Sequence, residues 1–184
     1  MIILDNLGEF RKGRLWINTF PNFQCTTIKT IKTIVESNNC NKINIYNITL
    51  ELLLMPRHTS NYGLLGAKFT PTNKGLLEIQ VDVSQYNGDI TKDSIAMPED
   101  EVHVGIPEEY AHSIMQTSIS VIKEIGGLPS GILQFNLGAH GYVGSSILIF
   151  SKITSAILKL MTKKVDVDLI REIKEQAAIE INLI

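Results

Sequence analysis

The most informative part of the chain is residues 105–161, which read GIPEEYAHSIMQTSISVIKEIGGLPSGILQFNLGAHGYVGSSILIFSKITSAILKLM. Pro107 suits the first turn of a helix, because its missing N–H would have no partner there. Apolar and small residues then recur with the period of a helix. Gly126 and Gly127 follow, and glycine readily adopts the left-handed conformation that ends a helix. We therefore expect a helix that begins at about Pro107 and ends at these two glycines.

A strand, a glycine-rich loop and a second helix are predicted next. Ile132–Leu137 is short, apolar and flanked by glycine, which favours a mostly buried strand. Three glycines within residues 138–144 predict a tight loop. Ser145 or Ser146 then offers a hydroxyl that can cap a helix over Ile147–Met161.

The second helix is apolar on two sides, so two different surfaces have to cover it. The sheet can cover one side. A third helix is predicted within Asp166–Ile184, with Asp166 as its cap and one apolar stripe. We expect this helix to cover the other side, either within the chain or across a dimer.

Two segments carry a resemblance to a known family. Residues 105–110, GIPEEY, and residues 138–150, GAHGYVGSSILIF, resemble the fourth domain of elongation factor G. That family typically reads Gly-Val-Pro-x-Glu-Tyr and, further on, Asp-Gly-Ser-Tyr-His-x-Val-Asp-Ser-Ser-x-x-x-Phe. The match covers roughly a third of the chain and extends weakly back to Gly75. The family's tyrosine, histidine and aspartate align with His140, Gly141 and Gly144.

The resemblance implies an α+β fold in which two helices lie on one face of a mixed sheet and are joined by a left-handed crossover. It also implies a domain that reaches into the small ribosomal subunit and contacts RNA with its tip loops. In this chain the tip positions are Asn73 and Lys74 in one loop and His140, Gly141 and Tyr142 in the other. The changed tip residues leave the scaffold in place without the family's tip chemistry.

Outside the matched part, the chain divides at residues 56/57 into an N-terminal αβ extension, 1–56, and the main domain, 57–184. Leu77–Val83 alternates apolar and polar residues, as a strand with one wet face does. The remaining expectations are a hairpin of Met1–Leu4 with Arg14–Phe20, a helix over Thr26–Val35, a β-rich run over Ile43–Met55 with a bulge or break at Tyr46-Asn47, and a loop over Arg57–Lys74.

Composition limits the functional classes. The 184 residues carry a net charge of −2, so the chain lacks the overall excess of positive charge that favours binding to nucleic acid. Cys25 and Cys40 lack a zinc spacing, and no secretory leader or membrane span is evident, so we expect a cytoplasmic protein. The phosphate-binding motif Gly-x-x-x-x-Gly-Lys-Ser/Thr is absent, so we expect neither binding nor hydrolysis of GTP. We also expect no cofactor.

The candidate site residues predict binding more readily than catalysis. His140 lies among glycines, but no carboxylate, cysteine or metal-ligand partner is evident in the same loop. Helix capping accounts for Ser145 and Ser146, and Cys25 has no nearby basic group that would activate it. The leading hypothesis is a binding protein that acts on the ribosome or another RNA, without catalytic or metal-ligating residues. The alternatives are a protein-interaction or self-assembling module and, with least support, a small-molecule enzyme that uses His140.

Overall fold

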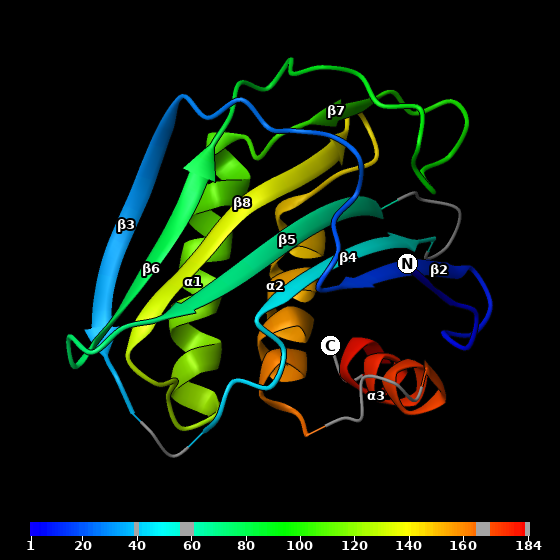
Figure 1. The fold of residues 1–184 in the computed structure, drawn as a ribbon. Helices are drawn as coiled ribbons and strands as arrows, with labels where there is room; N and C mark the ends of the chain where they lie inside the picture. Colours follow the sequence, from blue (N-terminus) through cyan, green and yellow to red (C-terminus); the bar gives the residue numbers. More distant parts are fainter. Residues whose placement is uncertain (39–40, 56–60, 165–169, 183–184) are drawn as a thin grey trace.

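One mixed sheet of eight strands organises the fold (Figure 1). The computed structural model describes residues 1–38, 41–55, 61–164 and 170–182. Seven strands follow the order β1-β2-β4-β5-β8-β6-β3, and the short β7 pairs with β8. The strands are β1 Ile2–Leu4, β2 Arg11–Ile17, β3 Lys29–Glu36, β4 Asn47–Leu54, β5 Asn61–Pro71, β6 Leu76–Val83, β7 Val102–Val104 and β8 Gly131–Gly141. The helices in the described residues are α1 Glu108–Glu124, α2 Ile147–Thr162 and α3 Ile170–Asn182. The expected α+β fold on a mixed sheet is therefore confirmed.

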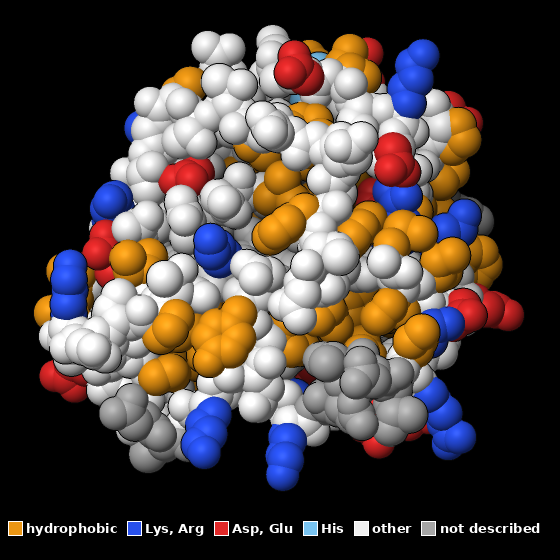
Figure 2. Space-filling view, in the orientation of Figure 1, with side chains coloured by type: hydrophobic (Ala, Val, Ile, Leu, Met, Phe, Trp, Pro, Cys, Tyr) orange, Lys and Arg blue, Asp and Glu red, His pale blue; other side chains and the backbone are white. Residues whose placement is uncertain are grey.

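Helices α1 and α2 pack side by side against one face of the sheet, behind the strands in Figure 1. The core between them contains Ile114 and Phe150 from the helices and Ile79 and Phe135 from the sheet, each with no more than a trace of exposed surface. We call the opposite face, which is turned toward the viewer, the front face. Among the described residues, the chain segments around residues 18–28 and 85–100 cross this face (Figure 1), and hydrophobic side chains lie at its surface (Figure 2).

Helix α3 covers the second apolar side of α2 within the same chain. Ile173, Ala177 and Ile181 of α3 are buried in the main core, and α3 contacts both α2 and β1. The expectation of a third covering helix is confirmed, and α2 therefore needs no second subunit. The predicted cap, Asp166, lies outside the described residues.

The predicted helix over Thr26–Val35 is wrong, because this segment forms β3. Its β-branched residues are stiff at the first side-chain torsion and pack well on a pleated surface. Ile31 and Val35 pack toward the helices, while Ile34 points away and is 62% exposed. The spacing of the isoleucines imitates a helix, but β3 pairs with β6 along its whole length.

The predicted loop over Arg57–Lys74 is also wrong, because Asn61–Pro71 is the long central strand β5. β5 pairs with β4 on one side and with β8 on the other, and residues of both its faces are buried. Buried strands read as nearly continuous apolar runs without alternation. The β4–β5 pairing crosses the predicted boundary at 56/57, so segments 1–56 and 57–184 share one sheet. The described part of residues 1–56 contains no helix.

The predicted loop over residues 138–144 is partly wrong, because β8 continues to Gly141. Its register with β5 shifts between Gly66 and Ala67, which pair with Leu137 and Phe135, and Asn136 is left without a partner. Such a bulge places two successive side chains on the same face of the sheet. Phe135 consequently faces the helices, whereas Asn136 and Leu137 both face the front.

The role of α3 can be tested by truncating its buried side. Ile173→Ala should lower the free energy of unfolding by roughly 2–4 kcal/mol, because it opens a cavity between α3 and the core. Ile179→Ala is the matched control, since Ile179 lies on the same helix but is 51% exposed. It should change the free energy by less than about 0.5 kcal/mol. Urea unfolding measures both, and equal losses would contradict the assigned orientation of α3.

Candidate functional site

The two predicted tip loops lie at opposite ends of β8. Asn73 and Lys74 belong to the turn between β5 and β6, beside the start of β8, where Pro71 pairs with Gly131. His140 and Gly141 lie at the other end, where they pair with β7. An eleven-residue strand is roughly 35 Å long. The structure therefore brings His140, Gly141 and Tyr142 together and keeps Asn73 and Lys74 apart from them.

His140 is a buried residue of the sheet and does not form part of a surface loop. Its exposed fraction is 0%, and it faces the helices beside Gly105 at the start of α1. Three rings surround it, with centroids 4.9 Å (Tyr86), 5.8 Å (Tyr110) and 5.9 Å (His103) away. An external partner can reach Tyr142, which is 56% exposed, but it cannot reach His140.

The hydrogen bonding of His140 is sparse. Nδ1 lies 3.4 Å from the carbonyl oxygen of Gly105, and Nε2 has no hydrogen-bond partner among the described residues. Burial lowers the pKa of His140, because it penalises the charged imidazolium, and the nearby His103 lowers this pKa further. The backbone carbonyl of Gly105 opposes the shift. His140 is therefore a neutral ring at ordinary pH.

Asp100 shapes the accessible loop at this end of β8. Its carboxylate accepts hydrogen bonds from the N–H groups of Val143 and Gly144, both at 3.0 Å. A Cβ at Gly141 would lie 2.0 Å from Oδ2 of Asp100, so a larger residue here would displace the Asp100 carboxylate. Ser146 caps α2 through the N–H of Ile149, as predicted. Gly141, Gly144 and Ser146 thus have structural roles.

The chemistry available around His140 is limited. Glu101 lies 2.9 Å from Nε2 of His103, but this nitrogen forms no hydrogen bond of good geometry with the described residues. The hydroxyl of Tyr86 donates to the carbonyl of Tyr142 at 3.3 Å. Burial raises the pKa of Tyr110, which keeps its hydroxyl protonated. Within the described ranges, no three His, Cys, Asp or Glu side chains are grouped as metal ligands.

A buried ionic network on the front face was not predicted. Arg14 bonds Glu51, which is 0% exposed, and its guanidinium also reaches the carboxylate of Asp93 at 2.6 Å. Glu51 further accepts hydrogen bonds from the hydroxyl of Tyr62 at 2.8 Å and from the N–H of Ile95 at 3.1 Å. Through these contacts Arg14 and Glu51 fasten residues 93–95 to the sheet.

Comparison with known proteins gives no family for the chain. No family model, no curated protein and no solved structure matches it. No helix in the described part of the chain is both long enough and apolar enough to cross a membrane.

The burial of His140 predicts a pH-dependent stability. The unfolded imidazole has a pKa of about 6.5, while the folded pKa is lower, so the contribution of His140 is complete above pH ~6.5 and is lost as the pH falls toward the folded pKa. We expect His140→Phe to lose less free energy of unfolding than the unmodified chain when the pH falls from about 7 to about 5. Urea unfolding at both pH values measures the difference. His112→Phe, at an exposed position on α1, should keep the original pH dependence; a dependence that His140→Phe leaves unchanged would refute the assignment.

Proposed function

We propose that the chain is a protein-interaction module that associates through the outer edge of β3, and that a second copy of the chain is the partner that this edge fits. β3 is the last strand in the sheet order and pairs only with β6 among the described strands. An edge strand presents unpaired N–H and C=O groups that can add another strand. This free edge of eight residues is the observation that carries the proposal.

The residue pattern of β3 suits antiparallel pairing with itself. Opposite residues of an antiparallel pair lie on the same face, so the two copies must pair residues of equal parity to keep their helices on one side. Pairing centred on Thr33 meets this condition. It places Ile31 opposite Val35 of the second copy and Thr33 opposite Thr33, and such β-branched pairs stabilise neighbouring strands.

The lysines of β3 are only a weak barrier to this pairing. Edge lysines commonly protect a sheet against association. Here Lys29 forms an ion pair with Glu108 of α1, and Lys32 lies 3.6 Å from Glu78 of β6. Carboxylates of the same chain thus offset both positive charges. Because α3 already covers α2, the edge of β3 is the more plausible surface for self-association.

Association through β3 can be tested at Ile34. In the proposed pairing Ile34 lies opposite Lys32 of the second copy, so Ile34→Lys places like charges opposite each other twice. We expect the unmodified chain to form a concentration-dependent dimer in sedimentation velocity experiments, and Ile34→Lys to weaken it at least roughly tenfold. Ile179→Lys on α3, also an exposed isoleucine, is the matched control. A chain that stays monomeric at all concentrations, or a dimer indifferent to Ile34→Lys, would rule out this interface.

We also propose that the chain has the fold of the fourth domain of elongation factor G, and this kinship supports ribosome binding as a second candidate function. β6 and β8 are parallel neighbours joined through α1. In Figure 1 both strands run upward, β6 lies to the left of β8, and α1 lies behind the sheet. This is the sense of a left-handed crossover, which is rare because right-handed connections are strongly preferred. Because such a connection is rare, its presence supports the proposed kinship.

Ribosome binding has a separate test. Tyr142 and Lys74 are exposed side chains, one from each of the two predicted tips. If either tip contacts the ribosome, the chain should sediment with ribosomes at moderate salt. Tyr142→Ala or Lys74→Ala should then reduce the pelleted fraction several-fold, whereas Ile34→Lys should not. Absence of the chain from the ribosome pellet, with dimerisation intact, would leave self-association as the function.

A further inference from the structure

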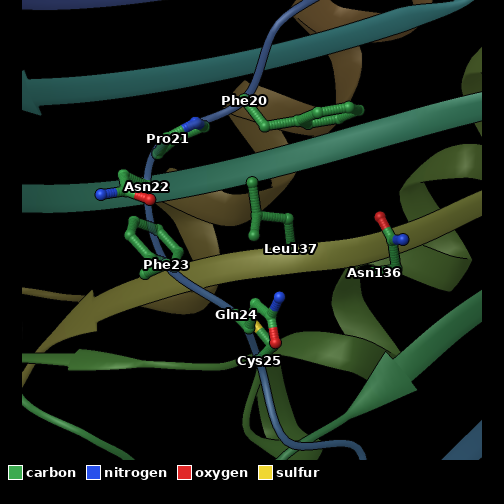
Figure 3. A pocket seen from close by; sticks show the side chains of 8 residues that line it. All are labelled: Phe20, Pro21, Asn22, Phe23, Gln24, Cys25, Asn136 and Leu137. Carbon is green, nitrogen blue, oxygen red and sulfur yellow. The ribbon is translucent and has the colours of Figure 1, made fainter.

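A hollow of about 680 Å³ lies on the front face of the sheet, away from the edge of β3. Residues 20–25, which we call the strap, cross the sheet in front of β5 and β8 (Figure 3). The hollow is lined by Phe20, Pro21, Asn22, Phe23, Gln24, Cys25, Asn136 and Leu137. Its volume falls in the range of small-molecule sites.

The sheet side of the hollow is shaped by the bulge in β8. Because Asn136 and Leu137 are both turned to the front, an amide and an apolar side chain stand side by side at its floor. Gly66 lies opposite Leu137 in β5, and a Cβ there would come within 2.9 Å of Leu137 and 2.8 Å of the Thr49 hydroxyl. A larger residue at position 66 would push Leu137 out. The bulge in β8 and Gly66 in β5 together determine the shape of the floor of the hollow.

The strap side is held in place at both ends. Pro21 is buried and has a fixed backbone torsion, which also restricts Phe20 before it to extended conformations. The sulfur of Cys25 lies 3.5 Å from the carbonyl oxygen and 3.4 Å from the nitrogen of Gly138 in β8. Burial raises the pKa of Cys25, so the thiol stays neutral and serves as a hydrogen-bonding anchor.

The lining offers aromatic surface and amide groups without charge. Phe20 is 50% exposed, and in Figure 3 its ring lies on one side of Leu137 and Gln24 lies on the other, with Asn136 further along β8. Asn22 points to the other side of the strap. The side chains of Gln24 and Asn136 form no hydrogen bond with any residue that the structure describes. Each carboxamide can donate and accept at the same time.

We propose that this hollow binds an uncharged purine-type ring, as in a nucleoside. A carboxamide forms paired donor and acceptor contacts with the edge of adenine. An aromatic side chain provides the flat surface on which a base stacks. Among the described residues that line the hollow there is no lysine, arginine or histidine, so they offer a phosphate group no counter-charge. The ligand class is therefore a nucleoside or free base in preference to a nucleotide.

The test is titration of the full chain with adenosine, followed by calorimetry and by the chemical shifts of the strap amides. We expect saturable binding of adenosine, no binding of ribose, and no tighter binding of AMP. Asn136→Ala, Gln24→Ala and Phe20→Ala should each weaken adenosine binding roughly tenfold. Asn73→Ala is the matched control, because Asn73 is also exposed but lies beside the start of β8, away from Asn136 in the middle of that strand, and it should leave the affinity unchanged.

Three results would overturn the proposal. They are the absence of saturable adenosine binding up to the solubility limit of adenosine, binding of ribose as tight as that of adenosine, or equal losses of adenosine affinity in Asn73→Ala and Asn136→Ala. Since Gln24, Phe20 and Asn136 are exposed, the variants should fold, and their urea unfolding midpoints check this. Ile34→Lys should bind adenosine normally, so the outcome does not depend on the edge of β3.

Discussion

The one-residue register shift in β8 determines which side chains face the helices and which face the front. In regular alternation, a helix-facing Phe135 would put Leu137 and Ala139 toward the helices and His140 toward the front. The unpaired Asn136 reverses this order. Leu137 and Ala139 join the smaller cluster on the front face, and His140 turns inward toward Tyr110. Both the buried histidine and the floor of the hollow therefore follow from the same bulge.

Helices α1 and α2 were predictable because local sequence signals specify where each of them begins or ends. Pro107 and the pair Gly126-Gly127 bound α1, and Ser146 caps α2, so each helix has a start or stop that does not depend on distant residues. The alternation in β6 is equally local. β3 and β5 lacked such signals. β3 carries isoleucines at helical spacing, and β5 is buried on both faces and contains two glycines that allow close approach of neighbouring side chains.

The candidate site was less predictable than the fold, since it depends on pairing between distant segments. The burial of His140 follows from an irregularity of β8 that has no local sequence signature. Arg14 and Glu51 are 37 positions apart and meet because β2 and β4 pair in that register. The same holds for the strap, whose Phe20-Pro21 step suggests an extended turn but does not indicate which strands it crosses. The residue types predicted the local backbone conformation, whereas the register of strand pairing determined which side chains are buried and which residues they contact.

Different regions of the molecule bury their apolar surface and pair their hydrogen-bonding groups to different extents. α3 covers α2, the network around Glu51 fastens residues 93–95, and Asp100 binds the loop after β8, so these regions already have partners within the chain. The edge of β3 and the hollow beneath the strap are two accessible places, in the part of the chain that the structure describes, where hydrogen-bonding groups lack such partners. One offers backbone groups in a straight row, which suits a strand; the other offers two separate amides beside a ring, which suits a small planar ligand. The different geometry of the unpaired groups, more than their number, is what separates a protein-binding surface from a ligand site in this fold.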